Sequence, residues 1–200
     1  MTTHVDYYFT PISPWTYLGH ARFAALVARH GATVAAKPVD YGRIFPVSGG
    51  LPLKQRAPQR QAYRLVELRR FRDALAIPLN LEPKYFPADA MPASLAITAA
   101  EASGGAADAA MKLAGACLRA CWAEERNIAD PATLEALVRE QGLDGGRVLS
   151  EAATTAARTQ FERWTQEAID RGVFGAPTYV VGGELFWGQD RLEFVERALA

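Results

Sequence analysis

The sequence has few of the features that mark a disulfide-stapled, membrane-spanning or nucleic-acid-binding protein. It contains 2 cysteines in 200 residues, so no framework of several disulfides can hold the fold together. Its 22 basic side chains balance its 22 acidic ones, which excludes a strong field toward nucleic acid or an anionic membrane. It has no run of about eighteen apolar residues that could cross a bilayer. We therefore expect small molecules or proteins as partners, and neither nucleic acid nor a membrane.

The first residues enter an apolar alternating segment without a positively charged leader or a small-residue cleavage site. This start predicts a cytoplasmic protein. The two cysteines, Cys117 and Cys121, are four residues apart in a segment that looks helical, which places them on one face rather than in a two-residue redox or zinc spacing. We expect two reduced, packed thiols; a metal pair or reactive thiols are the less common alternatives.

The amino-terminal segment has the pattern of a strand, a helix and a second strand. Residues 5–9 are β-branched and aromatic, and two prolines interrupt them directly afterwards. Ser13 stands before Pro14, as a helix N-cap stands before a proline in the first turn, and apolar residues at helical spacing continue to Gly31. Residues 32–39 then form a short apolar strand. A crossover helix between two strands predicts that the strands are parallel.

The middle of the chain is predicted to be a loop followed by helices. Residues 41–58, which are rich in glycine, proline and isolated cations, read as a loop. Helices are expected at 59–76, 91–103, 106–126, 131–141 and 150–171, with Asp130 as an N-cap before Pro131. The stops between them are expected at Gly104-Gly105 and Gly142.

The carboxyl-terminal segment returns to strands. Residues 178–181 and 184–187 are separated by Gly182-Gly183, which predicts a β-hairpin, and a helix is expected over 189–199. The order is therefore β-α-β, an all-helical insertion, then β-β-α. This predicts an α/β protein with one sheet domain built from residues 1–45 and 172–200 and a helical insertion domain at 46–171.

Two distant segments give this layout a specific resemblance. Ser13-Pro14-Trp15-Thr16 opens the first helix, and Gly175-Ala176-Pro177-Thr178 leads into a late strand, as in the thioredoxin superfamily. The stretches at 7–18 (YYFTPISPWTYL), 173–178 (VFGAPT) and 186–192 (FWGQDRL) resemble the 2-hydroxychromene-2-carboxylate isomerase family. That family belongs with the kappa-class glutathione transferases in the DsbA-like branch. The resemblance implies a thioredoxin-like fold, glutathione as cofactor and a homodimer.

The pair of cysteines that opens this helix in redox relatives is replaced here by Ser13 and Thr16, which excludes a dithiol cycle at this site. The resemblance implies that Ser13 is the catalytic residue and that its hydroxyl donates a hydrogen bond to the glutathione sulfur, near the positive end of the helix. A hydrogen bond to a charged group contributes about 1.5–3 kcal/mol. Lowering a thiol pKa by two units requires about 2.7 kcal/mol. A helix cap alone is the other reading of Ser13.

The resemblance also implies the glutathione-binding residues. Pro177 would follow a cis peptide bond that leaves the Ala176 backbone free to pair with the cysteinyl unit of glutathione, although an ordinary trans proline at a strand entry is the commoner case. Asp190 would accept the γ-glutamyl ammonium group, or cap the last helix. The remaining contacts are expected from Ser13, Trp187, Gly188 and Gln189.

The expected substrate-binding residues are Lys54 and Tyr85. Lys54, or Arg56, could meet the glycyl carboxylate of glutathione or a carboxylate of the substrate, whereas isolated surface cations are usually only solvated. Tyr85 lies where the isomerases carry an aromatic or hydroxyl-bearing residue, or it packs a proline-rich loop. No metal is expected.

The resemblance implies a glutathione-dependent isomerase of an unsaturated, carboxylated intermediate of aromatic degradation. A kappa-class-like glutathione transferase and a non-catalytic thioredoxin-fold binding module are the alternatives. A serine hydrolase would need a histidine base, and only His20 could come near Ser13.

Overall fold

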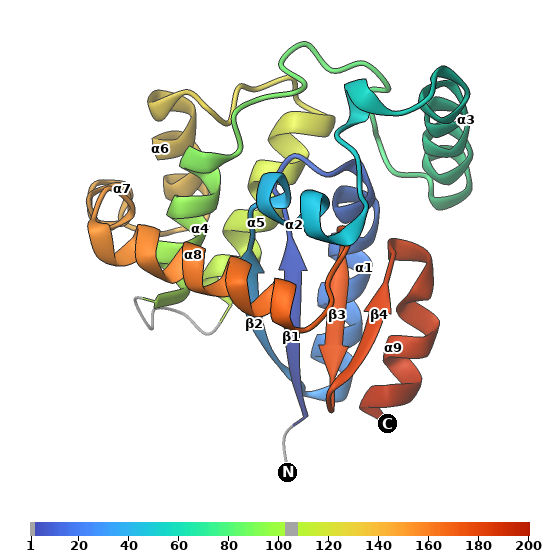
Figure 1. The fold of residues 1–200 in the computed structure, drawn as a ribbon. Coiled ribbons are helices and arrows are strands. Elements are labelled where there is room, and N and C mark those ends of the chain that lie inside the picture. The colour runs from blue at the N-terminus through green and yellow to red at the C-terminus, as the bar shows by residue number, and fades with distance from the viewer. Residues whose placement is uncertain (1–2, 103–107) are drawn as a thin grey trace.

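A mixed sheet of four strands lies at the centre of the molecule, and both ends of the chain contribute to it (Figure 1). The computed structural model describes residues 3–102 and 108–200. The strand order is β2-β1-β3-β4, with β1 parallel to β2 and antiparallel to β3, and with β4 antiparallel to β3. The strands are β1 (His4–Phe9), β2 (Thr33–Pro38), β3 (Thr178–Val181) and β4 (Glu184–Trp187). The predicted parallel pair and the predicted hairpin are both confirmed.

Helix α1 (Pro14–His30) connects β1 to β2 and has the ends that its sequence predicts. The Ser13 hydroxyl accepts a hydrogen bond from the backbone N–H of Thr16, and Pro14 occupies the first helical position. Gly31 ends the helix with φ of 59°, a left-handed conformation that costs glycine little. The helix N-terminus therefore lies at the end of the sheet where β1 stops.

Alternation along β1 separates the two faces of the sheet. Val5, Tyr7 and Phe9 belong to the main hydrophobic core, together with residues of α1 and of α9 (Leu192–Leu199). Tyr8 belongs to a second, smaller core on the opposite face, with residues of α8 (Thr155–Asp170) and α2 (Tyr41–Ser48). The helices of the β-α-β and β-β-α units, α1 and α9, therefore cover one face of the sheet, and α8 and α2 cover the other.

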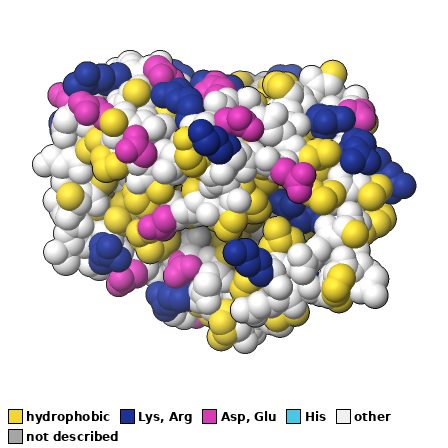
Figure 2. All heavy atoms as spheres, turned by 90° about the horizontal axis from the view of Figure 1, so that it is seen from above, with side chains coloured by type: hydrophobic (Ala, Val, Ile, Leu, Met, Phe, Trp, Pro, Cys, Tyr) yellow, Lys and Arg dark blue, Asp and Glu magenta, His cyan; other side chains and the backbone are white. Residues whose placement is uncertain are grey.

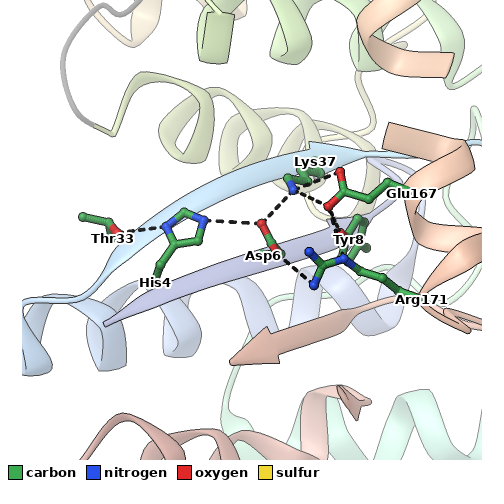
Figure 3. Close-up of polar contacts among 7 residues, drawn as sticks. All are labelled: His4, Asp6, Tyr8, Thr33, Lys37, Glu167 and Arg171. Atoms are coloured by element: carbon green, nitrogen blue, oxygen red, sulfur yellow. Dashed lines mark hydrogen bonds and ion pairs between the residues drawn. The ribbon is translucent and has the colours of Figure 1, made fainter. Parts of the chain in front are cut away.

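A network of charged side chains lies on the face covered by α8 (Figure 3). The Lys37 ammonium lies 2.7 Å from the Asp6 carboxylate and 2.9 Å from that of Glu167, and Tyr8 donates a hydrogen bond to Glu167. Arg171 contacts both carboxylates. Burial acts to raise the pKa of Asp6, but the hydrogen bond and charge of Lys37, together with the Arg171 charge, lower it below its usual value. The network ties β1 and β2 to α8.

The helical block follows the prediction in most of its elements. Its members confirmed by the structure are α3 (Pro58–Leu75), α4 (Met91–Ala102), α5 (Ala109–Trp122) and α6 (Pro131–Glu140). Asp130 caps α6 by accepting a hydrogen bond from the N–H of Thr133 at 2.8 Å, and Gly142 follows with φ of 74°. The predicted stop at Gly104-Gly105 lies outside the described residues. No strand interrupts the described part of this block.

Two predictions in the middle of the chain were wrong. Residues 41–48 form helix α2 rather than a loop, because Asp40 caps it and its buried Tyr41 and Ile44 pack into the smaller core, despite Pro46 inside it. Only the short η1 (Leu53–Gln55) interrupts the rest of the predicted loop. The single helix expected at 150–171 is two, α7 (Gly145–Ala152) and α8, since Asp144 caps the first and Thr154 the second. The last helical stretch begins as η2 (Gln189–Arg191) before α9.

Both cysteines are packed in the main core on α5. Cys117 and Cys121 are free thiols with exposed fractions of 0% and 2%. Burial raises the pKa of each thiol to about 12, so neither is a reactive thiolate near neutral pH. The main core includes residues of the sheet and of the helical block alike, and the division into two domains stays a prediction. In the described residues, no helix is both long and apolar enough to span a membrane.

Candidate active site

Ser13 lies at the start of α1, in the turn that follows β1. Its backbone N–H donates to the carbonyl of Thr10 at 3.0 Å, and its hydroxyl oxygen accepts from the N–H of Thr16 at 3.2 Å. The residue is 7% exposed. Ser13 is therefore a helix cap, as one of the two readings predicts. A hydroxyl that accepts through one lone pair keeps its hydrogen for donation, so the cap and a bond to a ligand are compatible.

The peptide bond between Ala176 and Pro177 is cis, as the resemblance implied. The carbonyl of Pro177 accepts from the N–H of Gly188 at 2.9 Å, which joins this turn to the segment after β4. Within the described residues, neither the N–H nor the C=O of Ala176 has a hydrogen-bond partner. Backbone groups of this kind can pair with an extended ligand in the manner of a strand.

The segment after β4 turns sharply toward α1. Gly188 adopts φ of 109°, and a Cβ at this position would lie 2.5 Å from the Asp190 carboxylate, so only glycine fits. Gln189 is 2% exposed, and Arg22 of α1 donates to its side-chain oxygen at 2.8 Å. Asp190 pairs with Arg191 at 2.9 Å and is half-exposed. Neither η2 nor α9 has a side-chain cap, so the cap reading of Asp190 is wrong.

These segments meet helix α3 around a cavity of about 530 Å³. Five of the predicted residues line it, namely Ala176, Trp187, Gly188, Gln189 and Asp190. Pro177 directly follows the lining residue Ala176, and Ser13 lies two residues before the lining residue Trp15, but neither lines the cavity itself. Figure 2 looks onto this end of the molecule and shows a hollowed surface where hydrophobic side chains lie among both basic and acidic side chains.

The two predicted substrate-binding residues lie away from this cavity. Lys54 is exposed in η1 and does not line it, whereas Arg56, two residues later, does. Tyr85 lines a separate hollow of about 440 Å³, together with residues of the turn before α6. The structure therefore does not bring Lys54 and Tyr85 together with the other predicted residues, and their roles stay predictions.

Sequence reasoning missed the contribution of α3, which supplies much of the cavity wall. Its lining residues recur every three or four positions, and they are Gln59, Arg60, Tyr63, Arg64, Glu67 and Phe71. This spacing puts them on one face of the helix and was readable from the sequence. The helix is polar on most of its surface, with Leu68 as its one fully buried residue, so its inward face could not be recognised by hydrophobicity. Trp15 of α1 meets Phe71 edge-on at 6.0 Å.

His20 is buried and does not line the cavity. One of its ring nitrogens lies 3.2 Å from the Tyr7 hydroxyl and the other 3.0 Å from the carbonyl of Met111. Burial lowers the pKa of His20 to about 4, so the ring is neutral at physiological pH. Both ring nitrogens are engaged, which leaves none for a hydrolase triad.

Taken together, the fold and the cavity define a class: a thioredoxin-fold protein whose redox cysteines are replaced by Ser13 and Thr16, with a cis proline beside a ligand-sized cavity. Comparison with known proteins agrees with this class. Residues 4–200 match the family described as the DSBA-like thioredoxin domain. The cytosolic disulfide reductase DsbM from Pseudomonas aeruginosa has a TM-score of 0.68 at 21% identity, covering 98% of this chain and 93% of that one, which shows the fold alone.

Proteins named 2-hydroxychromene-2-carboxylate isomerase are more similar. The one from Pseudomonas putida is 31% identical over 198 residues, which are 98% of this chain and 93% of that protein. The one from Sphingobium xenophagum is 28% identical over 200 residues, covering 100% and 99%. A solved 2-hydroxychromene-2-carboxylate isomerase structure has a TM-score of 0.82 at 29% identity and covers 98% of this chain and 94% of that one. This chain belongs to the 2-hydroxychromene-2-carboxylate isomerase family.

Proposed function

We propose that this protein is a glutathione-dependent isomerase that acts on 2-hydroxychromene-2-carboxylate or a closely related unsaturated carboxylate from aromatic degradation. The observation that carries the proposal is the end-to-end likeness to isomerases in a chain whose first helix opens on Ser13 and Thr16 instead of cysteines. A cavity bordered by this helix needs a thiol from outside the chain if sulfur chemistry is to occur there.

The residues around the cavity fit glutathione. Its cysteinyl backbone would pair with the unpartnered N–H and C=O of Ala176, and its ammonium group would meet the half-exposed carboxylate of Asp190. Trp187, Gly188 and Gln189 line the same wall. Ser13, at the N-terminus of α1, would meet the sulfur.

When bound, glutathione supplies a thiol whose ionised form adds reversibly to an unsaturated carbon and leaves after rotation about the former double bond. The chain's own contribution is electrostatic and positional. Ser13 donates its hydroxyl hydrogen to negative charge, and the positive end of the α1 helix dipole adds to the favourable field. Trp15, Phe71 and Trp187 give the cavity aromatic walls.

The direct test is turnover of 2-hydroxychromene-2-carboxylate with and without glutathione, followed by its ultraviolet spectrum. We expect conversion to the open-chain isomer only with glutathione present, and recovery of all the glutathione unchanged. Accumulation of a glutathione conjugate would instead identify a kappa-type transferase. Absence of glutathione binding in calorimetry at millimolar concentration would favour a non-catalytic binding module.

The proposal includes a cytoplasmic homodimer. Sedimentation of the purified chain should give twice the mass of the protomer, and a monomer at all concentrations would refute this part.

A further inference from the structure

Arg64 is partly buried at the cavity wall, whereas Arg60, Arg69 and Arg70 of the same helix are exposed. It is one of the lining residues, and its guanidinium carbon lies 5.3 Å from the ring centroid of Phe86 and 5.7 Å from that of Trp122. Trp122 is fully buried, so this contact joins the guanidinium to the core. Two aromatic rings therefore hold the position of the guanidinium.

The charge of Arg64 has no counter-ion in the described part of the chain. Its Nη2 is buried and has no hydrogen-bond partner there. Two other arginines of α3 are paired, Arg70 with Glu67 and Arg72 with Asp73, and the remaining two, Arg60 and Arg69, are exposed to water. Burial, together with the positive charge of Arg56, lowers the pKa of the Arg64 guanidinium. A buried, unpaired charge is costly, and such a cost is commonly kept where a ligand supplies the missing partner.

The surroundings of Arg64 are positively charged. Arg56 and Arg60 line the same cavity from the start of α3 and the turn before it. The acidic groups of the cavity wall are Glu67 and Asp190, and each already pairs with an arginine, Arg70 and Arg191 respectively. The cavity therefore offers an uncompensated positive charge to an incoming anion.

We propose that Arg64 is the anchor of a carboxylate-binding subsite in this cavity, in which its guanidinium binds a carboxylate of the ligand while Arg56 and Arg60 add positive potential. This inference rests on the proposed function and deepens it. Arg64 is a binding and positioning residue. A planar guanidinium matches a planar carboxylate with two parallel hydrogen bonds, and the aromatic contacts fix its plane. The carboxylate belongs either to the glycyl end of glutathione or to the unsaturated substrate.

The test compares Arg64→Met with Arg69→Met by calorimetry. Methionine removes the guanidinium and keeps an unbranched apolar stem like that of arginine. Arg69 is an exposed residue of the same helix that does not line the cavity. The probes are glutathione, γ-glutamylcysteine, which lacks the glycyl carboxylate, and chromone-2-carboxylate as a stable mimic of the substrate. We expect Arg64→Met to weaken the binding of one carboxylate by about 10- to 100-fold, and Arg69→Met to leave binding unchanged.

The probes distinguish the two sources of the carboxylate. If the glycyl carboxylate binds Arg64, Arg64→Met weakens glutathione and leaves γ-glutamylcysteine unaffected. If the substrate carboxylate binds Arg64, only chromone-2-carboxylate is weakened. Arg64→Lys, which keeps the charge but loses the planar fork, should recover part of the affinity.

A second readout separates binding from packing. Because Arg64→Met removes an unpaired buried charge, thermal unfolding of the ligand-free variant should occur at the same or a higher temperature than in the wild type. Unchanged binding of all three probes in Arg64→Met would overturn the proposal, whatever the unfolding temperature, and so would a wild-type protein that binds none of them. A wild type that binds chromone-2-carboxylate through Arg64 but never binds glutathione would refute the glutathione-dependent function and keep the subsite.

Discussion

Replacing Ser13 by alanine removes a hydroxyl that has two distinct roles, and their magnitudes can be separated. The first role is the cap of α1, seen as the 3.2 Å hydrogen bond from Thr16 N–H, whose loss should cost about 1 kcal/mol of unfolding free energy. The second is the proposed donation to the glutathione sulfur. Only the second should alter the pKa of a bound thiol.

The size of the second effect follows from the energy of the hydrogen bond. With both Ser13 and the helix terminus acting, a thiol of pKa about 8.5 would be lowered to about 6.5. Without Ser13, the helix terminus contributes about 0.3–1 kcal/mol and leaves the pKa of the thiol at about 8. At pH 7.5 the thiolate fraction should then fall from about nine-tenths to about a quarter.

The assay is the ultraviolet absorbance of the thiolate in the enzyme–glutathione complex, titrated against pH. Thr154→Ala is the matched control, because Thr154 caps α8 with a hydrogen bond of the same 3.2 Å length and does not line the cavity. We expect this control to lose similar stability and to keep the low thiol pKa. If Ser13→Ala bound glutathione with an unchanged thiol pKa, the helix terminus alone would be responsible and Ser13 would be only a cap.

Three further predictions concern binding, backbone conformation and acid stability. Asp190→Asn should weaken glutathione binding in calorimetry by about two- to fivefold, because an ion pair between the ammonium group and a half-exposed carboxylate is weak. Glu193→Gln in the next turn should leave glutathione binding unchanged, and equal affinity of the two variants would contradict the role proposed for Asp190. Gly188→Ala should lower the free energy of unfolding in urea by about 1–3 kcal/mol, since φ is 109° and the added Cβ meets the Asp190 carboxylate. Gly146→Ala in α7 should raise it by about 0.5–1 kcal/mol, and an unchanged stability of Gly188→Ala would refute the backbone strain at Gly188. Because the pKa of Asp6 is lowered in the folded state, its stabilising contribution is complete above the unfolded pKa of about 3.9 and is lost as pH falls through the lower folded pKa. A free energy of unfolding in urea that did not fall in this acid range would contradict the pairing of Asp6 with Lys37.

The elements predicted correctly are those whose signals are local. The cap at Ser13, the stop at Gly31 and the Gly182-Gly183 hairpin each depend on a few neighbouring residues, and the structure confirms all of them. Helix α2 was missed because glycine and proline lower helix propensity locally, while packing of Tyr41 and Ile44 against the smaller core outweighs that cost. Here tertiary contacts decided the secondary structure.

The candidate site divides in the same way. The resemblance pointed to Ala176, Trp187 and Asp190, and the structure places all three on one cavity wall. The sequence could not single out Arg64, because α3 has so few buried apolar residues that its pattern does not show which of Arg60, Arg64 and Arg69 faces inward.

By itself, the sequence determined the β-α-β and β-β-α units, the absence of a redox pair at the first helix and the turn residues that shape the site, because caps, glycine conformations and side-chain chemistry are properties of short segments. The tertiary structure alone decided which arginine of α3 has a buried guanidinium nitrogen without a partner, and that α3 and Ala176 line the same cavity. Burial of a charge depends on what the rest of the chain packs around it, and neighbouring residues in the sequence do not encode that.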